Sequence, residues 1–431
     1  MTHRDRTRST PARSRRADRV LALVQAGGQG SRMDVLTRER AKPALPFAGG
    51  FHLIDFALSS LAAAEIADVW VGVQYQAGSL DPYLAGGRPW DLDRTRGGFR
   101  RVVPEQGAGS RAETGFSRGN ADNLLRLADQ IEQFGPDQLV VMSADHVFSA
   151  DLSAVLDLHR ERGAECTLVT AQVSKREASQ NAVVTVNNRG RVTGFDYKPA
   201  KPQGTTVATE IFVYDTAVLL QVLGELRVWL SAAAAGDEDG ADSEADSGLG
   251  DFGEHLLPAF VRRGKVFALD IGGYWQDVGR PEAYLAAHRD LIAGRIDVFD
   301  RPDRPVLTSA PHRLPARITA GATVVDTQIG AGCRISGEVT NSVLGSDVIV
   351  HRGATVRNAV LFDGVEVHPG ASVDTAILDE RVQVLGRASV GGPSGRRTPR
   401  DDEIVLIGRD SIVGRGVAIG AGARLEPGTT A

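Results

Sequence analysis

An apolar residue recurs at every sixth position in the last third of the chain, and this period restricts the fold more than any other feature of the sequence. Six fits neither the 3.6-residue turn of an α-helix nor the alternation of a simple strand. It is typical of a parallel β-helix, where each apolar residue points inward from a flat side of a coil; the turns of a β-sandwich would not recur at this spacing. Shifts between groups are explained if some coils carry one residue more or fewer at a corner. The groups are Leu344, Val350 and Val356, then Leu361, Val367 and Val373, then Ile407, Val413, Ile419 and Leu425.

The preceding part of the chain has a different rhythm, because short β-rich runs alternate with helical patterns from residue 20 to about residue 290. This alternation predicts an α/β domain with a mostly parallel sheet. One helix is expected over residues 120–134, with Asn120 as its N-cap, and one hairpin over residues 182–197. The expected strands are VLALV, DVWVGV, QLVVMS, CTLVTAQV and KVFALDI.

Three segments lack the composition of a packed domain. Residues 1–19 are Arg-rich without the apolar core of a secretory signal, so we expect a disordered basic tail; a transit peptide and a contribution to effector binding are the alternatives. Residues 236–248 are acidic and rich in glycine, which predicts a mobile surface insertion. Residues 301–315 are rich in proline and suit a linker, so the expected domains span residues 20–300 and 316–431.

The overall composition excludes some classes of partner. A formal net charge of -5 gives no general attraction to nucleic acid. No apolar run approaches the ~20 residues that cross a bilayer, so a membrane is not expected either. The two cysteines, Cys166 and Cys333, lie far apart without metal-binding spacing, which suits a reducing compartment, most simply the cytoplasm.

A glycine-rich turn follows the first apolar run, in the stretch ALVQAGGQGSRMDVLTRERAKPAL. Gly27, Gly28 and Gly30 would let backbone N–H groups approach phosphate oxygens that a Cβ would hold away. The spacing matches neither a P-loop nor a dinucleotide-binding turn. Arg32 and Lys42 follow closely, and a polyphosphate needs such fixed cations to stabilise its departure. The turn therefore indicates a polyphosphate site, with a plain tight turn beside solvated basic residues as the alternative.

Two aspartates follow strands in positions suited to a metal ion. Asp145 ends the run VVMSAD, and Asp277 lies in the glycine-rich segment GGYWQDVGRPEAY. Ligands of open α/β sheets bind outside the carboxyl ends of strands, so both carboxylates could converge on one Mg²⁺ together with substrate phosphates. Each aspartate alone also fits a turn or an N-cap.

Together these motifs resemble the sugar-1-phosphate nucleotidyltransferases, and most closely the glucose-1-phosphate adenylyltransferases, also called ADP-glucose pyrophosphorylases. The likeness covers about residues 20–431, in the order of the family. The glycine turn with RAKP, and DFG with YWQDVG, are its most specific parts. The matching segments are AGGQGSRM, RERAKPAL, LIDFALSS, QYQAGSL, VVPEQ, SRGNADNLL, ADHVF, YKPAKP, DFGEHLLP and YWQDVGRPEAY, followed by the six-residue repeats.

The resemblance implies a Rossmann-like nucleotidyltransferase domain followed by a left-handed parallel β-helix, usually in a homotetramer that a small metabolite regulates. It implies that ATP and glucose 1-phosphate give ADP-glucose and pyrophosphate, a precursor step of glycogen synthesis, by Mg²⁺-assisted in-line displacement. Carried over by motif position, the implied roles are catalysis for Arg32, Lys42 and Asp145; Mg²⁺ binding for Asp145 and Asp277; nucleotide binding for Ala26, Gly27, Gly28, Gly30, Gln106, Gly119, Asn120 and Asp122; and sugar-phosphate binding for Tyr197, Lys198 and Glu210.

Five positions depart from the family pattern. Tyr197 replaces a carboxylate that normally accepts sugar hydroxyls, Glu210 replaces a glycine beside the sugar, and Arg280 replaces a small hydroxyl residue. Ala144 replaces a glycine before the metal aspartate, and Gln29 replaces an arginine in the glycine turn. Most of these changes fall on the sugar side of the expected pocket. Losing the partners of the sugar hydroxyls there strongly weakens discrimination between sugars. Glu210 either replaces the lost carboxylate from the opposite wall or pairs with Arg280.

The sequence therefore leaves several functions open. The first is an adenylyltransferase that uses glucose 1-phosphate or another hexose 1-phosphate. The second is a catalytically weak paralogue that regulates an active subunit in a mixed oligomer. The third is an acyltransferase in the β-helix that uses His351 and His368, although histidines at coil corners are typically solvated surface residues and the domain is short for that role.

Overall fold

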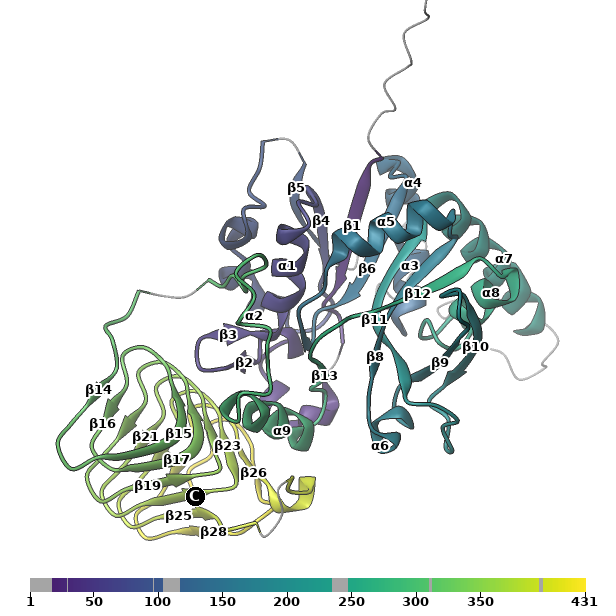
Figure 1. The fold of residues 1–431 in the computed structure, drawn as a ribbon. Coiled ribbons are helices and arrows are strands. Elements are labelled where there is room, and N and C mark those ends of the chain that lie inside the picture. The colour runs from purple at the N-terminus through teal and green to yellow at the C-terminus, as the bar shows by residue number, and fades with distance from the viewer. Residues whose placement is uncertain are drawn as a thin grey trace, which may run out of the picture.

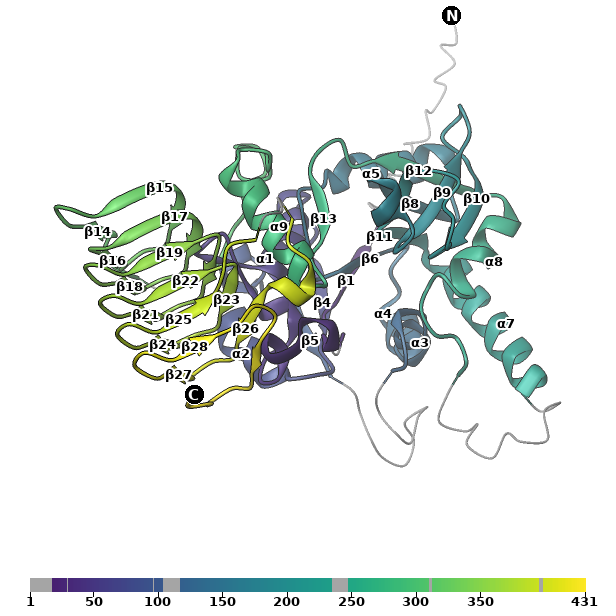
Figure 2. The same ribbon diagram turned by 90° about the horizontal axis from the view of Figure 1, so that it is seen from below.

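The computed structural model describes the protein over residues 18–28, 30–95, 97–103, 117–234, 247–309, 312–394 and 398–431. Two bodies lie side by side, an α/β domain and a stack of flat coils that ends at the C-terminus (Figure 1, Figure 2). The predicted fold class is confirmed in both parts. The first 17 residues, Gln29, Gln106 and residues 236–246 of the predicted insertion lie outside the described residues.

One nine-stranded sheet forms the centre of the α/β domain. One half is parallel, in the order β6 (Gln138–Ser143), β1 (Val20–Gln25), β4 (Asp68–Gly72) and β5 (Gly98–Val102). In the other half, antiparallel pairs join β11 (Thr206–Asp215) to β6, to β8 (Cys166–Gln172) and to the hairpin of β9 (Ala182–Val186) and β10 (Val192–Tyr197), and β12 (Val266–Asp270) runs parallel to β8. All five predicted strands and the predicted hairpin are confirmed.

Helices cover both faces of this sheet, and alternate residues of β1 therefore enter different cores. Ala22 and Val24 are buried on one face, and Leu21 and Leu23 on the other. The first core includes α1 (Leu53–Ala63), α5 (Leu152–Arg162) and α9 (Pro281–Ile292). The second includes α3 (Asn120–Arg126), α4 (Ala128–Phe134), α7 (Thr216–Ala234) and α8 (Leu256–Arg263).

Short elements complete the domain. They are α2 (Ala77–Leu84), α6 (Lys175–Ala178), the 3₁₀ helices η1 (Ser31–Thr37), η2 (Lys42–Ala44) and η3 (Ala85–Trp90), and the strand pairs β2 (Pro46–Phe47) with β3 (Phe51–His52) and β7 (His146–Phe148) with β13 (Trp275–Asp277). The pair of β7 and β13 matters most for function, because it joins the two segments that carry the candidate metal ligands.

The helix predicted over residues 120–134 is two helices, α3 and α4, which meet at Leu127. The prediction of Asn120 as the N-cap is wrong, because Gly119 takes that position and Asn120 is the first helical residue. The apolar periodicity was informative all the same: Leu124, Leu127 and Ile131 are buried on one side of both helices. A shared apolar face therefore does not reveal a break within it.

The apolar helix α7 is long enough over Thr216–Ala233 to cross a membrane by length and composition. Its buried residues Leu219, Leu223 and Leu226 belong to the core of the α/β domain. Val228 and Trp229 on the same helix are exposed. A helix with one packed face and one open face is typical of the surface of an α/β domain.

The C-terminal body is a left-handed parallel β-helix whose flat sides form parallel sheets. Val350 pairs with Val367 and Val367 with Val384, so one coil takes 17 residues, one fewer than three hexads. The inward positions predicted from the period are buried in one apolar core, apart from Ile419 and Leu425 in the last coil, which are partly buried. The prediction of the β-helix is confirmed.

Most strands of the β-helix have two or three residues, in keeping with flat coils that turn about every six residues, and two strands have seven residues. They are β14 (Arg317–Ile318), β15 (Thr323–Ile329), β16 (Arg334–Ile335), β17 (Glu338–Leu344), β18 (Ile349–Val350), β19 (Thr355–Arg357), β20 (Val360–Leu361), β21 (Glu366–Val367), β22 (Ser372–Asp374), β23 (Ala376–Leu378), β24 (Gln383–Val384), β25 (Ser389–Gly391), β26 (Val405–Ile407), β27 (Ile412–Val413), β28 (Ala418–Ile419) and β29 (Arg424–Leu425), with the 3₁₀ helix η4 (Asp401–Glu403) between β25 and β26.

The two bodies are joined by apolar packing and by a buried ion pair. Tyr284 of α9 packs edge-on against Phe362 of the β-helix, with ring centroids 6.2 Å apart. Arg40, just before η2, lies 2.8 Å from Asp379 and 2.6 Å from Glu380 of the β-helix. Both Arg40 and Asp379 have side chains only 3% exposed. The segment that leads to Lys42 is therefore held by the β-helix.

Candidate active site

The glycine turn lies directly after β1, at the carboxyl edge of the parallel strands. Gly30 has a φ of 67°, and a Cβ there would lie 3.1 Å from the Thr37 side chain and 3.2 Å from Cβ of Lys42. The Thr37 hydroxyl donates to the carbonyl of Gly30 at 2.8 Å. A larger residue would push the turn away from the segment that carries Lys42. Gly28 is exposed with open space around it, so the backbone of the turn is free to meet a ligand.

Lys42 meets both aspartates that the sequence predicts as metal ligands. Its Nζ lies 2.5 Å from Asp145 Oδ2 and 3.8 Å from Asp277 Oδ1. The aspartates come together because β7 and β13 pair antiparallel, which sets Asp277 opposite His146, the neighbour of Asp145. The Lys42 side chain is only 8% exposed, whereas those of Asp145 and Asp277 are 22% and 32% exposed. The carboxylates therefore remain open to an incoming ion.

Opposite charges hold these groups in their ionised forms. Burial disfavours each carboxylate, yet the Lys42 ammonium and His146 keep the pKa of Asp145 and that of Asp277 below their ordinary values. Burial also disfavours the ammonium, but the two carboxylates outweigh it and raise the pKa of Lys42. The exposed Arg32 acts on Lys42 in the opposite direction, so it lies within electrostatic reach. The cluster holds two anions and a cation at neutral pH.

His146 is a member of the cluster that the sequence analysis did not identify. Its Nε2 lies 3.5 Å from Asp145 Oδ1 and 3.9 Å from Asp277 Oδ1. The ring packs edge-on against Trp275, and its Nδ1 lies 3.3 Å from the carbonyl oxygen of Thr209. The only signal in the sequence is its place after Asp145 in the matching segment ADHVF.

Glu210 adds a third carboxylate from an irregular part of β11. The pairing of β11 with β8 shifts register between Ala208 and Phe212, and Glu210 between them has a φ of 59°. Glycine adopts that conformation with less strain, which accounts for the glycine in the family pattern. Burial, opposed by His146 and reinforced by Asp145 and Asp277, raises the pKa of Glu210 to about 7.

Arg280 does not form the ion pair with Glu210 that the sequence left open. The structure describes both residues and contains no ion pair between them; Arg280 is the N-cap of α9. The groups that act electrostatically on Glu210 are His146, Asp145, Asp277 and Asp251. The Glu210 carboxylate therefore belongs to the acidic side of the site.

Tyr197 and Lys198 connect this acidic side to the DFG segment. The Tyr197 hydroxyl donates to Asp251 Oδ2 at 2.9 Å, and Lys198 Nζ donates to the Tyr197 hydroxyl at 2.7 Å. The Tyr197 ring fills the space where a Cβ of Gly253 would stand, which explains why only glycine fits there. Burial, together with Asp251, raises the pKa of Tyr197. Where the family pattern has a carboxylate, this chain therefore has a tyrosine that is hydrogen-bonded to the carboxylate of Asp251.

Among the residues predicted to contact nucleotide, two lie at the start of α3, whereas the side chain of Asp122 is bound by other parts of the protein. Gly119 and Asn120 lie at the start of α3, and Gln25 of β1 donates to the carbonyl of Asn120 at 2.9 Å. Asp122 is only 1% exposed, and its carboxylate accepts from Arg118 N, Arg126 Nε and Ser247 Oγ. Its oxygens are therefore engaged by protein donors, and it fixes the loop.

These groups together suit a metal-bound polyphosphate. Two partly exposed carboxylates supply the hard oxygen ligands that Mg²⁺ prefers, and the residues present therefore fit this ion. A lysine and an arginine beside an open backbone turn suit phosphate oxygens. No side-chain nucleophile is needed for phosphoryl or nucleotidyl transfer, which depends on positioning and charge neutralisation.

The chain matches known families along most of its length. Residues 21–294 match the family described as nucleotidyl transferase, and residues 314–400 match the family described as GlmU-like, C-terminal hexapeptide. Similar proteins include the glucose-1-phosphate adenylyltransferase of Thermosipho africanus, 32% identical over 340 residues that cover 78% of each chain. That of Thermotoga neapolitana is 32% identical, covering 78% of this chain and 76% of the relative, and that of Ruminiclostridium cellulolyticum is 31% identical, covering 75% and 72%.

Proposed function

Because the chain belongs to the glucose-1-phosphate adenylyltransferase family of nucleotidyl transferases, we propose that it transfers an adenylyl group from ATP to glucose 1-phosphate, giving ADP-glucose and pyrophosphate. The observation that carries this proposal is the convergence of Lys42, Asp145 and Asp277 beside the glycine turn. A regulatory paralogue is not favoured, because the relatives bear the name of the enzyme and the charged groups of the site are present.

In the proposed reaction, an oxygen of the sugar phosphate attacks the α-phosphorus of ATP while pyrophosphate leaves in line with it. Lys42 and Arg32 face the phosphates and neutralise charge on the departing group. The turn at Gly27, Gly28 and Gly30 lets backbone N–H groups donate to phosphate oxygens. Mg²⁺, held by Asp145 and Asp277, would neutralise charge on the phosphate oxygens during the transfer.

The nucleotide and the sugar would occupy opposite sides of the acidic cluster. We assign Ala26, Gly119 and Asn120 to the side of the nucleotide, with Asp122 as a positioning residue that holds the loop of Gly119. Tyr197, Lys198 and Glu210 lie on the side of the sugar phosphate. Asp251 lies beside Tyr197 and supplies a carboxylate there. The proposed sugar site therefore still offers an acceptor for a sugar hydroxyl.

Another hexose 1-phosphate is the second candidate substrate. The observation in its favour is that Glu210, with its acidic neighbours, stands where the family has glycine. A charged side chain at this point narrows the choice of sugar, because each sugar hydroxyl must find a partner.

Pyrophosphate release from ATP, Mg²⁺ and a panel of hexose 1-phosphates tests the proposal. We expect turnover with glucose 1-phosphate, and loss of turnover in Asp145→Asn. Asp196→Asn, at an exposed aspartate of β10, is the matched control and should keep full activity. No turnover with any hexose 1-phosphate, while ATP still binds, would contradict the proposal and favour a regulatory role.

We also propose that the enzyme works as an oligomer, most simply a homotetramer, in the cytoplasm and under control of a small metabolite. The first coils of the β-helix expose apolar side chains that an oligomer would bury: Leu314 is 81% exposed, Ile318 54% and Val325 46%. Both cysteines are free and buried, which suits a reducing compartment. Light scattering measures the number of subunits, and a monomer would contradict the oligomer.

A further inference from the structure

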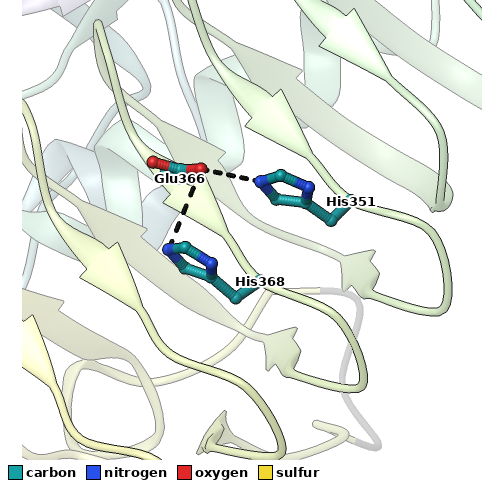
Figure 3. Close-up of side chains that lie close together, drawn as sticks. All are labelled: His351, Glu366 and His368. Carbon is teal, nitrogen blue, oxygen red and sulfur yellow. Dashed lines mark hydrogen bonds and ion pairs between the residues drawn. The ribbon is translucent and has the colours of Figure 1, made fainter.

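Two histidines and one glutamate form a compact cluster where a flat side of the β-helix meets a corner, outside the candidate active site (Figure 3). His351 Nε2 lies 2.7 Å from Glu366 Oε1, and His368 Nε2 lies 3.8 Å from the same oxygen. One potential ligand atom from each residue lies within 4.8 Å of the other two. The three side chains point toward a common position (Figure 3).

The repeat of the β-helix brings these residues together. Glu366 of β21 and His368, the residue after β21, flank the inward-pointing Val367 and so both face outward. His351 stands at the position equivalent to His368 in the preceding coil, because Val350 pairs with Val367. The two imidazole rings stack at 5.2 Å with planes 14° apart. The position of the cluster is therefore set by a rigid backbone.

The surrounding coils show that the pattern is specific to this place. Equivalent backbone hydrogen bonds place Ser336 before His351 and Leu385 after His368 in the column of corner residues. Ile349 and Gln383 flank Glu366 in the adjacent column. Neither column continues the charged or imidazole side chains into the next coil, so the three potential ligands coincide at a single point.

One nitrogen of the cluster lacks a partner. His368 Nε2 is shielded from solvent and has no hydrogen-bond partner within the described part of the chain. The Glu366 carboxylate, at 3.8 Å, is too distant for a hydrogen bond. A buried polar atom without a partner is costly, and a metal ion between this nitrogen and the carboxylate would satisfy it.

We propose that His351, Glu366 and His368 bind a Zn²⁺ ion. Zinc takes imidazole nitrogen and carboxylate oxygen at ~2.0–2.1 Å in tetrahedral geometry, so neighbouring ligand atoms lie ~3.3 Å apart. Two of the three separations, 2.7 and 3.8 Å, lie on either side of that value, and all three ligand atoms lie within 4.8 Å of one another. Two nitrogen ligands favour zinc over Mg²⁺ and Ca²⁺, which prefer oxygen alone.

The proposed site keeps one coordination position open. The side chain of His351 is 36% exposed, and those of Glu366 and His368 are 28% exposed. A water molecule or a ligand from solution therefore has access to the ion as the fourth ligand. The ion would join two coils of the β-helix, because the histidines come from successive turns.

Titration of the untagged, full-length protein with Zn²⁺ against a chromogenic chelator tests the proposal, in the presence of excess Mg²⁺ to occupy the candidate active site. We expect one tight equivalent in the wild type and none in His351→Ala/His368→Ala. Glu366→Gln keeps a hydrogen-bond acceptor but loses the charge, and it should weaken binding at least about tenfold. Co²⁺ in place of Zn²⁺ should give a visible absorption spectrum in the wild type that the double variant lacks.

Matched controls separate the site from other surface groups. His312→Ala removes an exposed histidine, and Glu338→Gln removes an exposed glutamate of the same β-helix. Both should bind Zn²⁺ as the wild type does, and circular dichroism should show that all variants are folded. Absence of the tight equivalent in the wild type, or its persistence in the double variant, would overturn the proposal. Pyrophosphate release should be unchanged in the double variant, so this test is independent of the proposed function.

Discussion

Replacement of Arg40 by methionine should destabilise the protein strongly, although Arg40 contacts no proposed substrate. Its guanidinium is only 3% exposed and lies 2.8 Å from Asp379, which is equally buried, and 2.6 Å from Glu380. Removing one partner of a buried ion pair leaves the other charge without compensation, which costs about 3–5 kcal/mol. Burial raises the pKa of Asp379 even though Arg40 opposes this shift. Loss of the guanidinium should therefore destabilise the ionised Asp379 carboxylate most.

Arg38 provides a matched control in the same segment. It pairs with Glu426 of the β-helix at 3.1 Å, but both side chains are more than half exposed. Exposed ion pairs contribute about 0–1 kcal/mol to stability, so the free energy of unfolding of Arg38→Met should lie within about 1 kcal/mol of the wild-type value. Adding Asp379→Asn to Arg40→Met should recover part of the loss, because the uncompensated charge is removed.

Urea unfolding followed by tryptophan fluorescence measures these differences. The account predicts a large loss for Arg40→Met, a small one for Arg38→Met and partial recovery in the double variant. Equal losses in the two arginine variants, or no recovery with Asp379→Asn, would refute the claim that burial decides the contribution of this ion pair.

Further predictions concern the charges of the site and of a buried carboxylate. Lys42→Met should lower kcat about 10²–10³-fold, the usual loss when a group that stabilises transition-state charge is removed; steady-state pyrophosphate release measures it, and an unchanged kcat would contradict the role. The pKa of Glu210 is raised to about 7, so its negative charge is lost as pH falls through 7. The Mg²⁺ concentration that gives half-maximal activity should therefore increase when pH is lowered from 8 to 6. The increase should be much smaller in Glu210→Gln. Burial raises the pKa of Asp55 from 3.8 to about 7, against hydrogen bonds from Tyr83, His52 and Thr308. The folded state therefore binds a proton that the unfolded state has lost, and the free energy of unfolding should fall as pH rises from 4 through 7, by up to about 4 kcal/mol relative to Asp55→Asn. Denaturant unfolding at pH 4 and pH 8 would measure this difference.

The fold was predictable because its signals are local and repeated. The six-residue period sets which side chains point inward in every coil, and the apolar runs of β1 and β6 predict strands that are buried on both faces. The break at Leu127 was not predictable, because α3 and α4 keep their apolar residues on one side across it.

The site was predictable where a residue type and its place at the end of a strand agree. Asp145 and Asp277 lie together as expected, but they do so through the antiparallel pair of β7 and β13 and not through neighbouring strands of the main sheet. The part played by His146 depends on the pairing of β7 with β13, and the conformation of Glu210 depends on a register shift in β11. The ion pair of Arg40 with Asp379 joins residues from different bodies, and a local pattern cannot reveal it.

A crystal structure with Mn²⁺ and a non-hydrolysable ATP analogue would test the central claim most directly, because anomalous scattering locates Mn²⁺ independently of the protein. The account predicts the ion between the carboxylates of Asp145 and Asp277, with the triphosphate beside it and in contact with Lys42 and the glycine turn. Nucleotide and metal bound elsewhere, with the lysine and the aspartates still paired to one another, would contradict it.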